Sequence, residues 1–145
     1  MYFLSINNLK HDLISKKLTE YDAFLYLVSQ STIIYIAYLL KTETTTNNFD
    51  VFHDITSLFI LILATYYCYV CNNKTNGTDF LLRFISISWV VTIRFVLITA
   101  ILYVPFSIIR DGKETGLIDV IFNITLDIAL YYRISHHIKI ISNNT

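Results

Sequence analysis

The stretch SWVVTIRFVLITA, from Ser88 to Ala100, decides the fold class, because it is among the most apolar runs in the chain and carries Arg94 at its centre. It lies within a longer apolar segment, at about 85–109. A helix needs about 20 residues to cross the hydrocarbon core of a bilayer, so this segment is long enough. It leaves no continuous polar face for water, which disfavours a surface helix of a soluble protein. The run therefore predicts a transmembrane helix with an internal charge.

Three further apolar segments of similar length occur at about 23–40, 51–70 and 117–134. Backbone polar groups inside lipid must be hydrogen-bonded within the segment, and none of these runs alternates in polarity as a barrel strand does. We therefore expect an all-α polytopic integral membrane protein, with four transmembrane helices in an up-down bundle. Residues 1–145 are expected to form a single four-span membrane domain. The alternative is a soluble bundle of unusually apolar helices.

The composition favours helices and excludes several classes of function. Hydrophobic residues make up 54% of the chain and charged residues 15%, and only three glycines and one proline are present, which disfavours a loop-rich β fold. Eleven basic and eleven acidic residues give no net charge, so we expect no nucleic-acid partner. No phosphate-binding glycine loop, metal-ligand spacing or catalytic constellation occurs, so we expect no enzyme, no cofactor and no metal.

Basic residues are distributed unequally between the two predicted sides of the membrane. One side has seven and the other has three: Lys10, Lys16, Lys17, Lys74, Arg83, Arg133 and Lys139 against Lys41, Arg110 and Lys113. Because lysine and arginine concentrate in cytoplasmic loops, we expect a multi-pass protein of a cell inner membrane with both termini cytoplasmic.

Residues 1–20 show apolar positions at helical spacing with lysines between them. This pattern predicts an amphipathic interfacial segment on the inner leaflet. The alternative is a contact helix for a cytoplasmic partner.

Arg94 needs a partner, because a charge at bilayer depth costs several kcal/mol. It lies about 13 Å from the cytoplasmic end of its segment, and Asp127 lies about 10 Å from the same side of the last segment, at 1.5 Å per residue. We therefore expect an ion pair between Arg94 and Asp127.

Asp119, Asn123 and Asp127 recur every four residues and form one polar stripe, and Gln30 lies in the middle of the first segment. Two interpretations are open. Either the Arg94–Asp127 pair only fixes the register of the helices, or these five residues form a polar path or gate, within one bundle or at the centre of a homo-oligomer.

Cys68 and Cys71 form a CxxC pair at the end of the second segment. Membrane thiol–disulfide oxidases carry such a pair, but they resemble this chain in helix number only and use a second cysteine pair, which is absent here. The predicted cytoplasmic edge also keeps thiols reduced. Ordinary apolar helix positions are the favoured interpretation, with redox chemistry, acylation or metal capture as alternatives.

Three functional hypotheses follow. The first is a small oligomeric membrane protein of the channel, pore or effector type, which forms or gates an ion-permeable path or perturbs the lipid bilayer. The second is a membrane anchor or sensor that docks a cytoplasmic protein through basic residues, namely Lys10, Lys16, Lys17, Lys74 and Arg83. The third is a thiol–disulfide oxidoreductase that uses Cys68 and Cys71.

Overall fold

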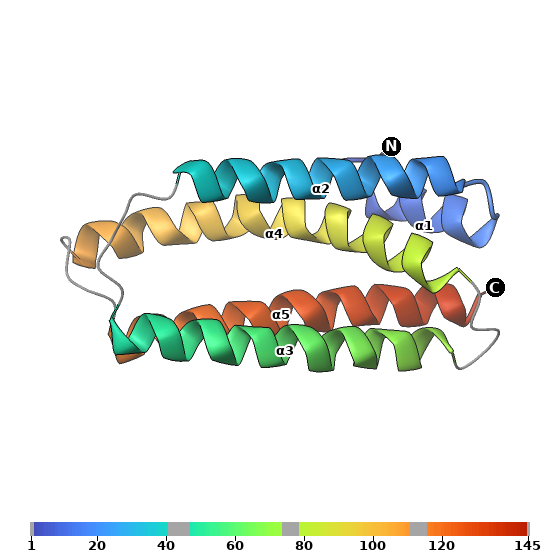
Figure 1. The fold of residues 1–145 in the computed structure, drawn as a ribbon. Coiled ribbons are helices and arrows are strands. Elements are labelled where there is room, and N and C mark those ends of the chain that lie inside the picture. Colours follow the sequence, from blue (N-terminus) through green and yellow to red (C-terminus); the bar gives the residue numbers. More distant parts are fainter. Residues whose placement is uncertain (1, 41–46, 74–78, 111–115, 145) are drawn as a thin grey trace.

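The computed structural model describes residues 2–40, 47–73, 79–110 and 116–144, except for the side chains of 37, 38, 40, 102 and 104–110. The described residues form five α-helices (Figure 1). They are α1 (Ile6–Ile14), α2 (Glu20–Leu40), α3 (Asn48–Asn72), α4 (Phe80–Arg110) and α5 (Leu117–Ser142). Each of the four apolar segments is helical, which confirms the predicted all-α class.

Capping side chains fix where the second and third helices begin. Thr19 and Asp22 cap α2, because the Thr19 backbone N–H donates to the Asp22 carboxylate at 2.9 Å and the Asp22 N–H donates back to the Thr19 hydroxyl at 3.3 Å. Asn47 and Asp50 repeat this capping box at the start of α3. In both boxes, polar side chains satisfy backbone donors that the first helical turn leaves without a partner.

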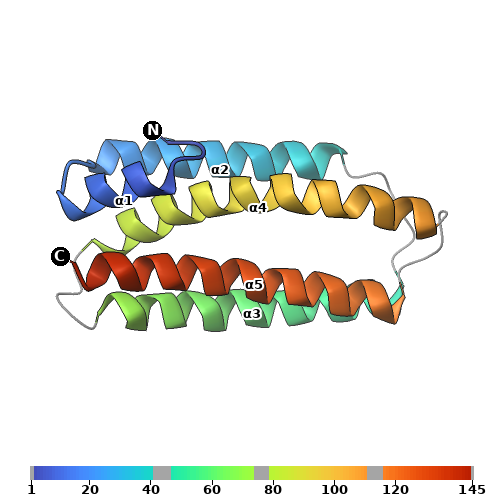
Figure 2. The same ribbon diagram turned by 180° about the vertical axis from the view of Figure 1, so that it is seen from behind.

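The four long helices alternate in direction, and helices two places apart in the sequence pack side by side. α3 lies along α5 and α2 lies along α4, so each close pair is parallel (Figures 1 and 2). α4 also contacts α5 and joins the two pairs, whereas among the described residues α2 contacts neither α3 nor α5. Both chain ends lie at the same end of the bundle, where α1 also lies.

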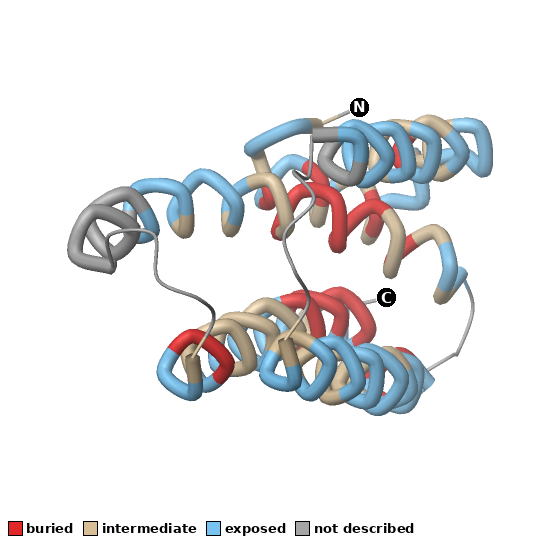
Figure 3. Tube along the Cα trace, turned by 60° about the vertical axis from the view of Figure 1, so that its left-hand side comes forward, coloured by how far each residue is buried: buried red, intermediate tan, exposed pale blue. Residues whose placement is uncertain are grey.

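Buried side chains gather at the end of the bundle that contains the chain termini (Figure 3). This core combines residues from every helix, including Leu9, Tyr26, Cys68, Val90 and Ile138. Towards the opposite end, burial decreases. Among the described residues, no position on α4 after Val91 is buried. On α5 before Ile134, the buried described positions are Asp119 and Val120. One end of the bundle therefore packs as a protein core, and at the other end most of the described side chains are exposed or only partly buried.

The first helix differs from its predicted setting. Its apolar face, formed by Ile6, Leu9 and Leu13, is at most 5% exposed and packs against α4 and α5. The sequence assigned this face to the inner leaflet, but protein covers it. The helix is amphipathic because it closes the core, and its histidine, His11, is exposed.

Among the described residues, two helices are long and apolar enough to cross a membrane, namely α3 and the part of α4 from Phe80 to Ile101. Only about a tenth of the residues in the apolar window of α3 are buried. Large apolar side chains on its surface include Phe59, Leu63 and Tyr66, which are 62%, 66% and 66% exposed. Residues three and four apart lie on the same face of a helix, so these three side chains form one exposed apolar stripe along α3.

Candidate functional site

A short hydrogen bond joins the paired helices α3 and α5. The hydroxyl of Ser57 donates to the carboxylate of Asp127 over 2.5 Å, and both side chains are partly buried. Fifteen residues later on both helices, the Ser142 hydroxyl donates to the Asn72 carbonyl over 2.9 Å. Equal spacing of the two contacts fixes the register of a parallel helix pair along about 22 Å, at 1.5 Å per residue.

Ser57 also contacts a histidine one helical turn earlier. His53 Nε2 lies 3.3 Å from the Ser57 hydroxyl, and His53 Nδ1 lies 3.4 Å from the carboxylate of Asp54, which is exposed. Residues four apart lie on the same face of a helix, which places His53 above Ser57. We call His53, Ser57 and Asp127 the polar row. It runs from near the start of α3 into the interface between α3 and α5.

The order of contacts Asp54, His53 and Ser57 resembles a hydrolase triad, but the geometry does not present Ser57 as a nucleophile. The Ser57 hydroxyl directs its proton to Asp127, so it is not presented to a substrate. Ser57 also lies inside α3, where backbone N–H groups are engaged in the helix and provide no oxyanion hole. Hydroxyl, imidazole and carboxylate groups in a row can instead pass a proton along hydrogen bonds.

The predicted ion pair between Arg94 and Asp127 is not formed. Arg94 Nη2 donates a hydrogen bond to the backbone carbonyl of Leu4, in the segment that precedes α1. Contacts between a basic side chain and a carboxylate among the described residues join His11 to Asp12 and His53 to Asp54, and neither includes Arg94. Arg94 therefore attaches the N-terminal segment to α4, and Asp127 belongs to the polar row.

Helix geometry explains why Arg94 and Asp127 do not form an ion pair although they lie at similar depths along their helices. Arg94 lines a cavity between α4 and α5 together with Ala129 and Arg133. Asp127 precedes Ala129 by two residues, which corresponds to a rotation of about 200° around α5. Its carboxylate consequently faces α3, on the opposite side of the helix from Arg94.

The other residues of the predicted path are not all brought together. Asp119 is buried and accepts a hydrogen bond of 2.7 Å from the backbone N–H of Gly116, so it caps the start of α5. Asn123 is partly buried one turn before Asp127, on the same face of α5. Gln30 lies on α2, which does not contact α5 among the described residues, so it is remote from the polar row.

The two cysteines are free thiols in the core at the terminal end of the bundle. Cys68 is 0% exposed and Cys71 is 4% exposed. Such burial suits small apolar side chains and gives a protein substrate no access to the sulfur atoms. The observed setting agrees with the interpretation as ordinary helix positions.

Arg83 was predicted to dock a partner, but it is only 4% exposed. Its guanidinium donates to the side-chain oxygen of Asn72 over 3.0 Å. Because Asn72 also accepts from Ser142, these three residues join α3, α4 and α5 at the terminal end. Arg83 is therefore a structural contact and not a surface for docking.

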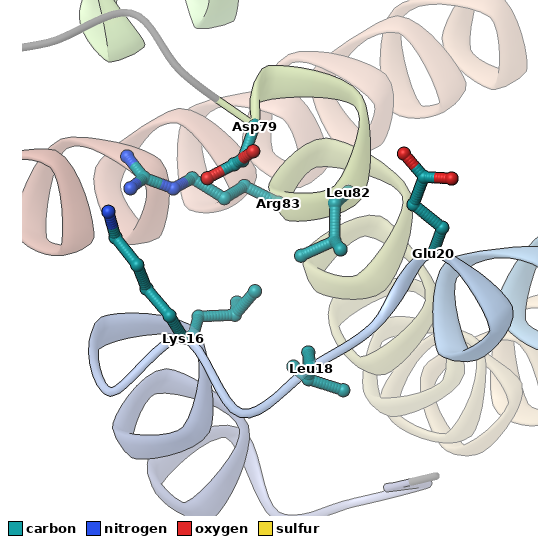
Figure 4. A pocket seen from close by; sticks show the side chains of 7 residues that line it. Lys16, Leu18, Glu20, Asp79, Leu82 and Arg83 are labelled. Atoms are coloured by element: carbon teal, nitrogen blue, oxygen red, sulfur yellow. The ribbon is translucent and has the colours of Figure 1, made fainter.

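The lysines that were predicted to dock a partner do not form one cluster at the terminal end of the bundle. Lys16 and Lys17 are exposed, Lys10 is partly buried, and Lys74 lies outside the described residues. Lys16 lines a small pocket of about 140 Å³. Figure 4 shows its ammonium group on the same side as Arg83 and Asp79, with Glu20 across the pocket. Opposite charges in so small a space do not favour a ligand of one sign.

Sequence reasoning selected Asp127 but missed Ser57, its partner. The available signal was the pair His53 and Ser57, four residues apart in an apolar helix, because such a pair places two polar groups on one face. No family model, curated protein or solved structure matches this chain.

Proposed function

We propose that the protein is a membrane protein with four spanning helices that provides a gated, proton-permeable path along the polar row. The supporting observation is the hydrogen-bonded array of His53, Ser57 and Asp127 between two helices whose outer faces are apolar. Ionisable side chains inside membrane helices commonly mark proton or ion paths. The path lies within one chain and does not require the homo-oligomer that the sequence also favours.

Helix length and packing support four spans. The helices α2, α3, α4 and α5 contain 21, 25, 31 and 26 residues. At 1.5 Å per residue they measure about 32 to 47 Å, enough to cross a hydrocarbon core of about 30 Å. α5 packs along α3, and α2 packs along α4, so a membrane crossed by α3 and α4 also contains their partners.

The inner end of the α3–α5 interface supports a closed state. Beyond Asp127, at the terminal end, Cys68, Ile134 and Ile138 are at most 1% exposed. Ile134 follows Asp127 by seven residues, two helical turns later on the same face. An apolar constriction excludes water from a path, so these side chains form the proposed gate.

Proton flux into liposomes tests this function. The purified protein is reconstituted with a pH-sensitive dye inside the vesicles, and a potassium diffusion potential drives protons inward. We expect Ile134→Ser, which makes the gate polar, to raise the flux at least about tenfold above wild type and above protein-free vesicles. Absence of flux in both wild type and Ile134→Ser contradicts the proposal. Ile128→Ser, on the exposed surface of the same helix, is the matched control and is expected to behave as wild type.

A further inference from the structure

A basic cavity lies between α4 and α5, away from the polar row. Its volume is about 300 Å³. Arg94 contributes from α4, and Arg133 and His137 contribute from α5. Ala129, Arg133 and His137 are spaced four residues apart, so they form one face of α5 that is turned towards α4. The rest of the lining is apolar and consists of Val91, Phe95 and Ile98 in addition to Ala129.

Polar groups on one side of the cavity are available to bind an anion. His137 is 5% exposed, and its Nδ1 has no hydrogen-bond partner among the described residues. The contacts between a basic side chain and a carboxylate among the described residues involve other side chains, so Arg133 has no carboxylate partner there. Arginine presents a planar fork of donors that fits phosphate, and neutral histidine can add one N–H.

The electrostatic field around His137 is positive. His137 lies in the electrostatic field of Lys10, Arg133 and Arg94. These cations come from α1, α4 and α5, which all pack together at this end of the bundle. Concentrated positive charge next to an apolar wall favours a ligand with an anionic group and a hydrocarbon part.

The cavity also lies at an edge of the apolar surface. On α4, the residues after Arg94 are exposed and apolar, for example Leu97 at 53% and Ile101 at 73%. On α5, Tyr132 is 70% exposed, whereas Ile134 and the core residues that follow it are buried. The arginines therefore lie where the exposed apolar residues of α4 and α5 meet the packed terminal end of the bundle.

We infer that this cavity binds an anionic phospholipid, with the lipid phosphate held by Arg94, Arg133 and His137 and an acyl chain against Phe95 and Ile98. Basic pockets between membrane helices on the cytoplasmic side are suited to such head groups. The inference rests on the membrane setting of the proposed function but not on proton conduction.

Lipid retention tests the inference on the full chain in mild detergent. Dioleoylphosphatidylglycerol and dioleoylphosphatidylcholine, which share acyl chains, are added separately, and bound lipid is counted by native mass spectrometry. We expect the anionic lipid to be retained at least about tenfold more strongly, as charge-assisted hydrogen bonds predict. Equal retention of the two lipids overturns the inference. Millimolar inorganic phosphate that displaces the anionic lipid completely identifies a free-anion site and also overturns it.

Variants separate the cavity from general surface charge. Arg133→Gln is expected to lower retention of the anionic lipid about tenfold. Lys139→Gln, an exposed cation on the same helix outside the cavity, is the matched control and is expected to retain lipid as wild type does. Equal effects of the two substitutions contradict the inference. A chain that stays dissolved without detergent overturns both proposals, whereas lipid retention without proton flux overturns proton conduction alone.

Discussion

The Ser57 hydroxyl lies 2.5 Å from a carboxylate oxygen of Asp127, and this contact joins two parallel helices that are separated by α4 in the sequence. The acceptor is a charged group in a mostly apolar interface, so the bond contributes to stability as well as to the proposed path. A charge-assisted hydrogen bond contributes about 1.5–3 kcal/mol.

Ser57→Ala is expected to lower the free energy of unfolding by about 1.5–3 kcal/mol, because it leaves a partly buried carboxylate without its donor. Thr56→Val is the matched control, because the Thr56 hydroxyl donates to the Phe52 carbonyl of its own helix at 2.8 Å and joins no second helix among the described residues. Chemical denaturation in mild detergent measures both. A loss for Ser57→Ala no larger than that for Thr56→Val shows that this bond does not hold the helix pair.

The separation of Arg94 from Asp127 is tested by a double-mutant cycle. Arg94→Leu and Asp127→Leu are each expected to destabilise the protein, and the coupling energy between them is expected to stay below about 0.5 kcal/mol. Independence follows because Arg94 bonds to Leu4 and Asp127 bonds to Ser57. A coupling above about 1 kcal/mol indicates a direct ion pair and contradicts the structure.

Much of the fold follows from the sequence, because four apolar runs of sufficient length predict four helices. What the sequence could not supply is the choice of neighbours. Short connectors favour packing between consecutive helices, yet α3 pairs with α5 and α2 with α4. Depth along a helix can be counted from its end, whereas the direction in which Asp127 faces depends on which helix lies beside it.

Single residues also differ in whether their roles could be predicted from the sequence. Asp119 occupies the third position of α5 after Gly116, where an acidic side chain typically caps a helix, so its role was available from the sequence. Arg83 was counted with a connector, but α4 begins at Phe80 and includes it. The contact of Ser57 with Asp127 could not be predicted from Ser57 alone, because an isolated serine is tolerated in an apolar helix without any polar partner.

Lys16 offers a test of local strain. It has a φ of 52° immediately after α1, and the Lys17 N–H donates to the Asp12 carbonyl at 2.9 Å, which closes the helix in a Schellman turn. This left-handed conformation costs a residue with a Cβ roughly 1–2 kcal/mol. We therefore expect Lys16→Gly to raise the free energy of unfolding by up to about 1 kcal/mol, after the entropy of glycine in the unfolded chain is included.

Lys17→Gly is the control for this substitution, because positive φ among the described non-glycine residues occurs at Lys16 and Asp79 only. It removes a lysine from the same turn without relieving strain, so it is expected to be neutral or destabilising. The same denaturation measurement applies. Stabilisation by Lys17→Gly as large as that by Lys16→Gly contradicts the assignment of strain to Lys16.

The attachment of the N-terminal segment is expected to depend on pH. The Tyr2 hydroxyl donates to Asp12 over 2.5 Å, and this bond is the main cause that lowers the pKa of Asp12 and raises the pKa of Tyr2. A lowered carboxyl pKa stabilises the contact above the ordinary value near 4, and the contribution is lost as pH falls through the lowered pKa. A raised phenol pKa preserves the contact until pH rises above about 10.

Trp89 provides the signal for this measurement, because Phe3 packs edge-on against it with ring centroids 6.0 Å apart and the chain has no other tryptophan. Its fluorescence is expected to be constant at neutral pH and to change below about pH 4 as the segment detaches. Tyr2→Phe is expected to remove this acid transition. Identical titrations of wild type and Tyr2→Phe are incompatible with the contact.

Proton flux through two matched carboxylate variants tests the polar row most directly. In the Ile134→Ser background, Asp127→Asn keeps an acceptor for Ser57 but cannot exchange a proton, and Asp119→Asn makes the same change at the cap of α5. We predict that Asp127→Asn lowers the flux at least about tenfold, whereas Asp119→Asn leaves it unchanged. Equal flux through the two variants contradicts a path along His53, Ser57 and Asp127.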